Sequence, residues 1–142
     1  MKKLNYAVRC ILKAESLAEE LDEEIKWGHV YKTIAAFWEV IELLLRAIIY
    51  GRKRTTYESP GKLISVFVQI IQPPYIRQIT SDLNTLYNYR KRVIHKAILL
   101  NRGDVLEAKQ IFCKLMPILL EILEKDGYKI YKLKMIHRNL CL

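Results

Sequence analysis

The chain has few of the residues that crosslink or interrupt a fold. Of its 142 residues, three are cysteine, five are glycine and four are proline. The number of cysteines is odd, and no two of them, Cys10, Cys113 and Cys141, have Cys-x-x-Cys spacing. The sequence therefore indicates neither a disulfide framework nor a zinc knuckle. A chain of this length buries roughly 68% of its unfolded surface and needs no such staple. We therefore expect one domain with reduced thiols, as in a reducing cytoplasm.

Long uncharged hydrophobic runs are also missing. Arg9, Lys13 and Glu15 interrupt the N-terminal segment and leave no stretch long enough for a signal peptide. The most apolar runs, 43–50 and 63–71, are too short or too broken by charge to cross a bilayer. We expect a soluble, cytoplasmic protein that does not enter a membrane.

Acidic residues are the scarcer charge. Asp and Glu total 15 against 24 Lys and Arg, which gives a net charge of +9 at pH 7. This excess would attract polyanions such as nucleic acids. The first predicted helix holds a cluster of acidic residues, namely Glu15, Glu19, Glu20, Asp22, Glu23 and Glu24. RNA is therefore expected to avoid that face, and the rest of the chain is more basic than the average.

Apolar residues recur at helical spacing through almost the whole chain. The pattern predicts helices over about 4–25, 34–50, 60–71, 75–100 and 104–125. Their expected boundaries are Gly51 as a C-terminal stop, Ser59-Pro60 as a cap, Pro73-Pro74 as a stop, and Asp104 with Glu107 as a capping box.

The C-terminal segment departs from this pattern. Residues 128–134 alternate apolar with basic side chains, which fits either a short strand or a bound arm. Between the second and third predicted helices, the segment 52–58 is expected to be a basic loop. The chain has no internal repeat and no glycine-rich phosphate loop. The sequence thus predicts an all-α fold, an antiparallel bundle of four to five helices over residues 1–127, followed by a basic C-terminal tail over 128–142.

The predicted fourth helix carries the chemistry of the chain. Arg90 and His95 lie five residues apart within Leu86-Tyr87-Asn88-Tyr89-Arg90-Lys91-Arg92-Val93-Ile94-His95-Lys96. An arginine can hold a phosphate, and a histidine can move a proton near neutral pH. His95 lies about 140 degrees around the helix from Arg90.

Arg90 occupies a position where a buried apolar residue is expected. It continues the inward seam formed by Ile79, Leu83, Leu86, Val93 and Ala97. A guanidinium placed there needs a carboxylate, a subunit interface or a pocket that admits phosphate. Two such helices crossing in a symmetric dimer would bring both motifs together.

These residues resemble the HEPN superfamily of prokaryotic nucleotide-binding and ribonuclease domains. The resemblance consists of Arg-x4-His late in the fourth helix, the preceding Leu86-Tyr87-Asn88-Tyr89, and a following turn with a last amphipathic helix. The second helix, with aromatics followed by Glu39, Glu42 and a leucine run ending in Arg46, is similar to the family pattern as well. Lys91 stands where many members have a small polar residue, and Ala97 where one subgroup has tyrosine.

The resemblance implies a metal-independent endoribonuclease that acts as a homodimer, as a toxin-antitoxin or defence component, without a cofactor. His95 would be the general base or acid and Arg90 would bind the scissile phosphate, leaving 2′,3′-cyclic phosphate ends. A nucleotidyltransferase or another antitoxin is the implied protein partner. RNA contacts are expected from a further set of residues, Lys91, Tyr87, Arg92, Arg52, Lys53 and Arg54.

Two other functions remain open. The chain could be a catalytically silent HEPN-like module that binds nucleotide or nucleic acid or docks onto a partner, or a purely structural helical protein. In the structural case His95 is buried and Arg90 pairs with Glu39 or Glu42. Tyr87 and Tyr89 could stack on bases or simply pack. His29 and His137 have no ligand spacing around them, so no metal site is expected.

Overall fold

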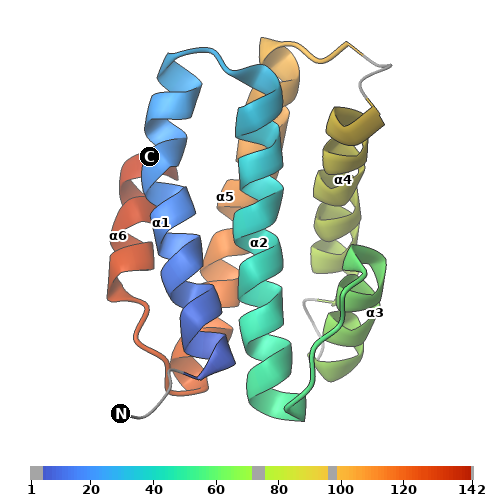
Figure 1. Ribbon diagram of the computed structural model, residues 1–142, viewed down its shortest axis with the longest axis vertical. Helices are drawn as coiled ribbons and strands as arrows, with labels where there is room; N and C mark the ends of the chain where they lie inside the picture. Colours follow the sequence, from blue (N-terminus) through green and yellow to red (C-terminus); the bar gives the residue numbers. More distant parts are fainter. Residues whose placement is uncertain (1–4, 72–75, 96–98, 142) are drawn as a thin grey trace.

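The described part of the chain consists of helices joined by loops. The computed structural model describes residues 5–71, 76–95 and 99–141. These form α1 (Tyr6–Lys26), α2 (Val30–Lys53), α3 (Pro60–Ile70), α4 (Ile76–His95), α5 (Arg102–Lys125) and α6 (Tyr131–Cys141), as Figure 1 shows. No strand occurs among these residues, so the predicted all-α class is confirmed. No described helix is both long enough and apolar enough to cross a membrane.

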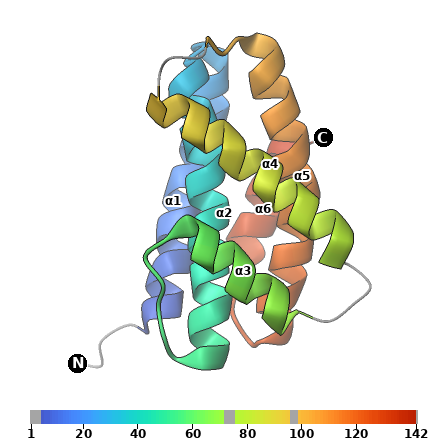
Figure 2. The same cartoon turned by 90° about the vertical axis from the view of Figure 1, so that its right-hand side faces the viewer.

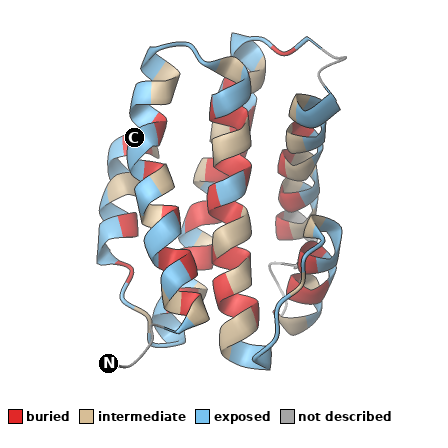
Figure 3. Ribbon diagram, viewed as in Figure 1, coloured by how far each residue is buried: buried red, intermediate tan, exposed pale blue. Residues whose placement is uncertain are grey.

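Helix α2 forms the centre of the bundle. It packs against α1, α3, α4 and α5. Its apolar residues at helical spacing are fully buried, namely Ile34, Phe37, Trp38, Ile41, Leu45 and Ile48. Phe37 and Trp38 are among the largest side chains of the core, and burial continues on the neighbouring face through Leu44 and Ile49. Figure 3 shows that buried positions concentrate along α2 and on the sides of the other helices that face it. A helix that is apolar on more than one side is stable only when neighbours cover it in this way.

Of the two alternatives for the C-terminal segment, a short strand or a bound arm, the strand is wrong. Residues 131–141 form α6, which packs on α1 and α5 through the buried side chains of Leu133 and Leu140. Lys132 forms an ion pair of 2.6 Å with Glu19 on the acidic first helix. Seven residues of alternating polarity suggested period two, but the longer series Ile130, Leu133, Leu140 follows the helical period.

The helix boundaries combine confirmed and corrected predictions. Ser59 caps α3, with its hydroxyl accepting a hydrogen bond from the Lys62 amide at 3.4 Å. Asn101, and not Asp104, caps α5: its side chain accepts from the Asp104 amide at 3.1 Å and the Asp104 carboxylate accepts from the Asn101 amide at 2.8 Å. Residues 99 and 100 are not helical, so α4 is shorter than predicted. Leu4, Pro73-Pro74 and Ala97 lie outside the described residues.

Gly51 has a different role from the one predicted. Helix α2 continues through Lys53 and ends at Arg54, which has a positive φ of 56°. A Cβ at Gly51 would lie 2.6 Å from the Tyr128 hydroxyl oxygen. Because it has no side chain, Gly51 allows the Tyr128 side chain, which follows α5, to pack close to α2. It does not terminate the helix. The segment expected to be a loop starts two residues later than predicted, because Arg52 and Lys53 are helical.

The prediction of unpaired thiols is also wrong. Cys113 on α5 and Cys141 on α6 form a disulfide, with their Cα atoms 5.7 Å apart, and Cys10 is a buried free thiol. An odd number of cysteines does not exclude one pair, and the helical course of α6 brings Cys141 beside α5. The disulfide fastens the last helix to the bundle.

Candidate functional site

Helix α4 lies across the outside of the bundle. It packs on α2, α3 and α5, and Figure 2 shows it crossing α2 and α5 obliquely. Ile79, Leu83 and Leu86 are buried as predicted, but the next core position is filled by Tyr89 and not by Arg90. The buried face of α4 therefore shifts by one residue, from position 90 to position 89, and Arg90 is half-buried.

Tyr89 fixes the rotation of α4 about its own axis. Its hydroxyl donates a hydrogen bond of 2.6 Å to the Glu107 carboxylate and lies 3.5 Å from the Asp104 carboxylate, both on α5. Burial raises the pKa of the Tyr89 hydroxyl well above its usual range, and the two carboxylates raise it further. Of the two alternatives for Tyr89, packing and base stacking, the buried position supports packing.

Arg90 has no carboxylate partner within the described part of the chain. The Glu42 carboxylate lies 3.8 Å from the Arg46 Nε on its own helix, and Glu39 is exposed and forms no ion pair with another described residue. Arg46 instead donates hydrogen bonds to the Tyr57 and Glu58 carbonyl oxygens and so holds the loop after α2. The structural alternative, a buried ion pair between Arg90 and helix α2, is therefore wrong. A half-buried guanidinium without an acidic neighbour can still accept an anion.

His95 is the last residue of α4 and is exposed to solvent. It forms no hydrogen bond within the residues described here. The alternative of a core histidine held by a backbone partner is wrong. An exposed imidazole can reach both a substrate and bulk water, which is what proton transfer requires.

The other predicted contacts on α4 engage aromatic rings of the same chain. The Lys91 ammonium lies 4.9 Å from the Tyr87 ring centroid, and that ring packs against Trp38 with centroids 5.2 Å apart. The Arg92 guanidinium lies 5.3 Å from the Tyr89 ring centroid. Lys91 and Arg92 are exposed, so both cations remain available on the outer face. Tyr87 is half-buried and already packed on one side.

The basic segment Arg52, Lys53 and Arg54 lies away from this site. It forms the C-terminal end of α2, at the opposite end of the bundle from the C-terminal end of α4 (Figure 1). Arg52 is also occupied, since it donates two hydrogen bonds of 3.1 Å to the Asp126 carboxylate. Within one chain, this segment cannot contact the same nucleotide as His95.

Exposed apolar side chains surround the end of α4 where His95 lies. Ile94 is 55% exposed and Leu99 is 89% exposed. Near the same end, the α1–α2 turn and the start of α5 expose Trp27 and Leu106 and line a hollow of about 370 Å³. The Tyr31 hydroxyl accepts a hydrogen bond of 3.3 Å from the Leu100 amide and ties the segment after α4 to α2.

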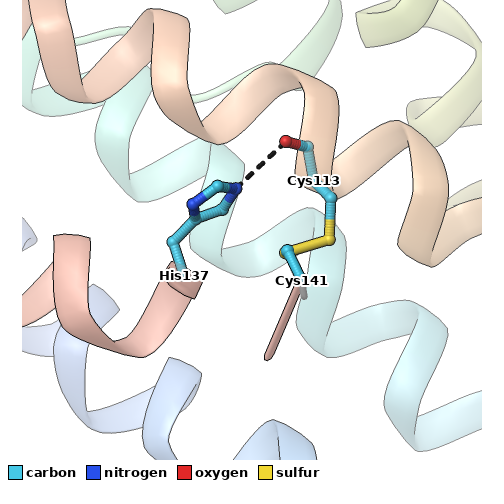
Figure 4. Close-up of a disulfide and its surroundings, with 3 residues drawn as sticks. All are labelled: Cys113, His137 and Cys141. Carbon is cyan, nitrogen blue, oxygen red and sulfur yellow. Dashed lines mark hydrogen bonds between the residues drawn. A yellow bond between two sulfur atoms is a disulfide. The ribbon is translucent and has the colours of Figure 1, made fainter. Parts of the chain in front are cut away.

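A second group of reactive side chains was missed in the sequence. Cys113, His137 and Cys141 bring their ligand atoms within 4.8 Å of one another, at the α5–α6 contact in Figure 4. The expectation that His137 lacks ligand spacing is wrong, because His137 and Cys141 lie four residues apart on one helix. The signal was present, but it required residues 131–141 to be recognised as helical.

Comparison with family models, with characterised proteins and with solved structures gives no match to this chain.

Proposed function

We propose that this protein is a metal-independent endoribonuclease of HEPN type that acts as a homodimer in a toxin-antitoxin or defence system. The observation that carries the proposal is the burial and the surroundings of Arg90 and His95, the two residues of the Arg-x4-His motif. Arg90 is half-buried with no carboxylate beside it in the described structure, and His95 is exposed at the end of the same helix. A side chain that binds phosphate needs a free positive charge, and a side chain that transfers protons needs access to substrate and water, so both environments fit the proposed roles.

The proposed reaction uses the ribose 2′-hydroxyl as nucleophile. His95 takes the proton of that hydroxyl, the 2′-oxygen attacks the phosphorus, and the 5′-oxygen of the next nucleotide leaves with a proton. Arg90 stabilises the additional negative charge on the phosphoryl oxygens. The products carry a 2′,3′-cyclic phosphate and a 5′-hydroxyl. DNA lacks the nucleophile and is not cleaved by this route.

A second copy of the chain would complete the site. Because Arg90 and His95 lie about 140 degrees apart on α4, one helix alone does not direct both groups at one phosphate. The exposed Ile94 and Leu99, which precede and follow His95 in the sequence, offer apolar surface for a symmetric contact. In such a dimer the motif of each copy faces that of its partner, and the outward cations Lys91 and Arg92 extend the positive surface.

The cellular setting follows from the same proposal. RNA is the substrate and the cytoplasm is the compartment in which the enzyme meets it. An active ribonuclease of this kind needs a neutralising partner, and the family resemblance implies an antitoxin, either a nucleotidyltransferase or another protein. The exposed cations of α4 are the surface on which an acidic inhibitor would compete with RNA.

The decisive experiment is cleavage of single-stranded RNA by the purified protein in the presence of a metal chelator. We expect His95→Ala to lower the rate by about 10²- to 10⁴-fold, the usual contribution of a general acid or base. Arg90→Ala is expected to lose about 10²- to 10³-fold, as removal of an oxyanion donor does. Lys91→Ala should have a milder effect, mainly on substrate binding.

Matched controls separate this site from other causes. His29→Ala removes an exposed histidine that pairs with Glu24, and Lys53→Ala removes a cation at the far end of the bundle. Both should keep full activity. A 2′-deoxy substitution at the cleaved linkage should abolish the reaction, and dilution below the dimer dissociation constant should lower specific activity. Cleavage that survives in both His95→Ala and Arg90→Ala would refute the assignment.

A silent nucleic-acid-binding module is the second candidate. The observation in its favour is that Lys91 lies over the Tyr87 ring and Arg92 over the Tyr89 ring, which places two exposed cations on α4 that can bind phosphate without chemistry. In that case the protein binds RNA with a strong salt dependence, and no variant changes a cleavage rate.

A further inference from the structure

The contact between α5 and α6 contains a set of metal-ligand side chains. Cys113 comes from α5, and His137 and Cys141 come from one face of α6, four residues apart. All three are partly buried, and their ligand atoms lie within 4.8 Å of one another. In Figure 4 the His137 ring lies beside the two sulfurs, with its Nε2 at 3.1 Å from the Cys113 carbonyl oxygen.

Two thiolates and an imidazole are the donors that Zn²⁺ prefers. Tetrahedral Zn²⁺ with Zn–S bonds of about 2.3 Å and Zn–N bonds of about 2.0 Å holds its ligand atoms roughly 3.5 to 3.8 Å apart. Ligand atoms already within 4.8 Å reach that spacing by side-chain rotation, provided that the two sulfurs are not bonded to each other. The two thiolate charges balance the charge of the ion.

Solvent reaches the site from one side. A hollow of about 460 Å³ is lined by Cys141 and His137 together with Glu121, Glu124 and Arg138. A water molecule entering from this hollow, or a carboxylate of its wall, can supply the fourth ligand. The same opening admits a small thiol to the disulfide.

We propose that Cys113, Cys141 and His137 form a Zn²⁺ site when the disulfide is reduced. The metal and the disulfide are then alternative links between the last two helices. Two equivalents of a low-molecular-weight thiol donate two electrons and two protons to the protein disulfide and become a disulfide themselves. Zn²⁺ then displaces the two protons from Cys113 and Cys141.

His137 changes its proton position in this exchange. In the disulfide form Nε2–H donates to the Cys113 carbonyl oxygen. For Nε2 to bind Zn²⁺, the ring carries its proton on Nδ1 and the carbonyl loses that donor. Oxidation of the two thiolates by a disulfide oxidant reverses the sequence and releases the ion. The site therefore responds to the thiol redox state of its surroundings while keeping α6 attached in both forms.

The test compares metal binding by the reduced and the oxidised protein. The chain is reduced with a thiol, desalted without oxygen, and titrated with Zn²⁺ against a chromophoric chelator and with Co²⁺ as a spectroscopic probe. We expect one ion per chain, a sulfur-to-cobalt charge-transfer band, and binding at least 100-fold tighter than that of the oxidised chain. Cys113→Ser and Cys141→Ser should each remove the charge-transfer signal of a two-thiolate site.

The role of His137 and the specificity of the site need their own variants. Even a group that only supports a metal ligand is worth roughly 10- to 100-fold in affinity, so His137→Ala should weaken Zn²⁺ binding by at least that much. Cys10→Ser and His29→Ala, which change a cysteine and a histidine elsewhere, should bind as the native chain does. The reduced and oxidised native chains have the same sequence, so their comparison does not depend on whether a variant folds. Equal affinity in the two redox states, or loss of binding in Cys10→Ser, would overturn the proposal.

Discussion

The disulfide between α5 and α6 should make a large and measurable contribution to stability. It closes a loop with a sequence separation of 28 residues. For a loop of this length, the chain-entropy relation gives about 12 cal/mol/K, which is about 3.6 kcal/mol at 25 °C. Unfolding of 142 residues carries an entropy of about 0.3 kcal/mol/K, so loss of the link should lower Tm by about 12 °C.

The perturbation is Cys141→Ser, measured in metal-free buffer by urea unfolding followed by helical circular dichroism. The oxidised native chain should have a free energy of unfolding about 3.6 kcal/mol higher than the variant. Addition of a thiol reductant should lower the free energy of unfolding of the native chain by the same amount and leave that of Cys141→Ser unchanged. If the reductant lowers the free energy of unfolding of both proteins equally, or of neither, the entropic argument and the assigned disulfide are refuted.

Two further substitutions test how the ends of α4 and α5 are held. Tyr89→Phe removes the hydrogen bond to Glu107 and should lower the free energy of unfolding by about 1.5 kcal/mol at pH 7, measured in urea. Because the folded-state pKa of Tyr89 is raised, its contribution to the free energy of unfolding is complete below about pH 10 and is lost as the pH rises further. Above about pH 10 the free energy of unfolding should therefore fall less steeply with pH in Tyr89→Phe than in the native chain. Parallel alkaline profiles of the two proteins would contradict this. Asn101→Ala removes the cap of α5 and should cost about 1 kcal/mol in thermal unfolding, and an unchanged Tm would show that the capping box contributes nothing.

The sequence determined the helical class and most of the core. The period of the apolar residues depends only on the geometry of one helix, so the stripes of α1, α2 and α5 could be recognised without tertiary information. The capping of α3 by Ser59 could be recognised for the same reason, because a cap is a contact between near neighbours in the chain. The prediction of Arg90 and His95 as a candidate site likewise depends only on their spacing along one helix.

Only the tertiary structure decided which side chains of different helices meet. The turn of the α4 seam from Arg90 to Tyr89 follows from carboxylates on α5, which no pattern within α4 contains. The position of Arg52 at the far end of the bundle, and the pairing of Cys113 with Cys141, depend in the same way on how helices distant in the sequence pack together. Periodicity fixes the face that a helix buries, whereas the partner of that face is selected by the packing of the whole chain.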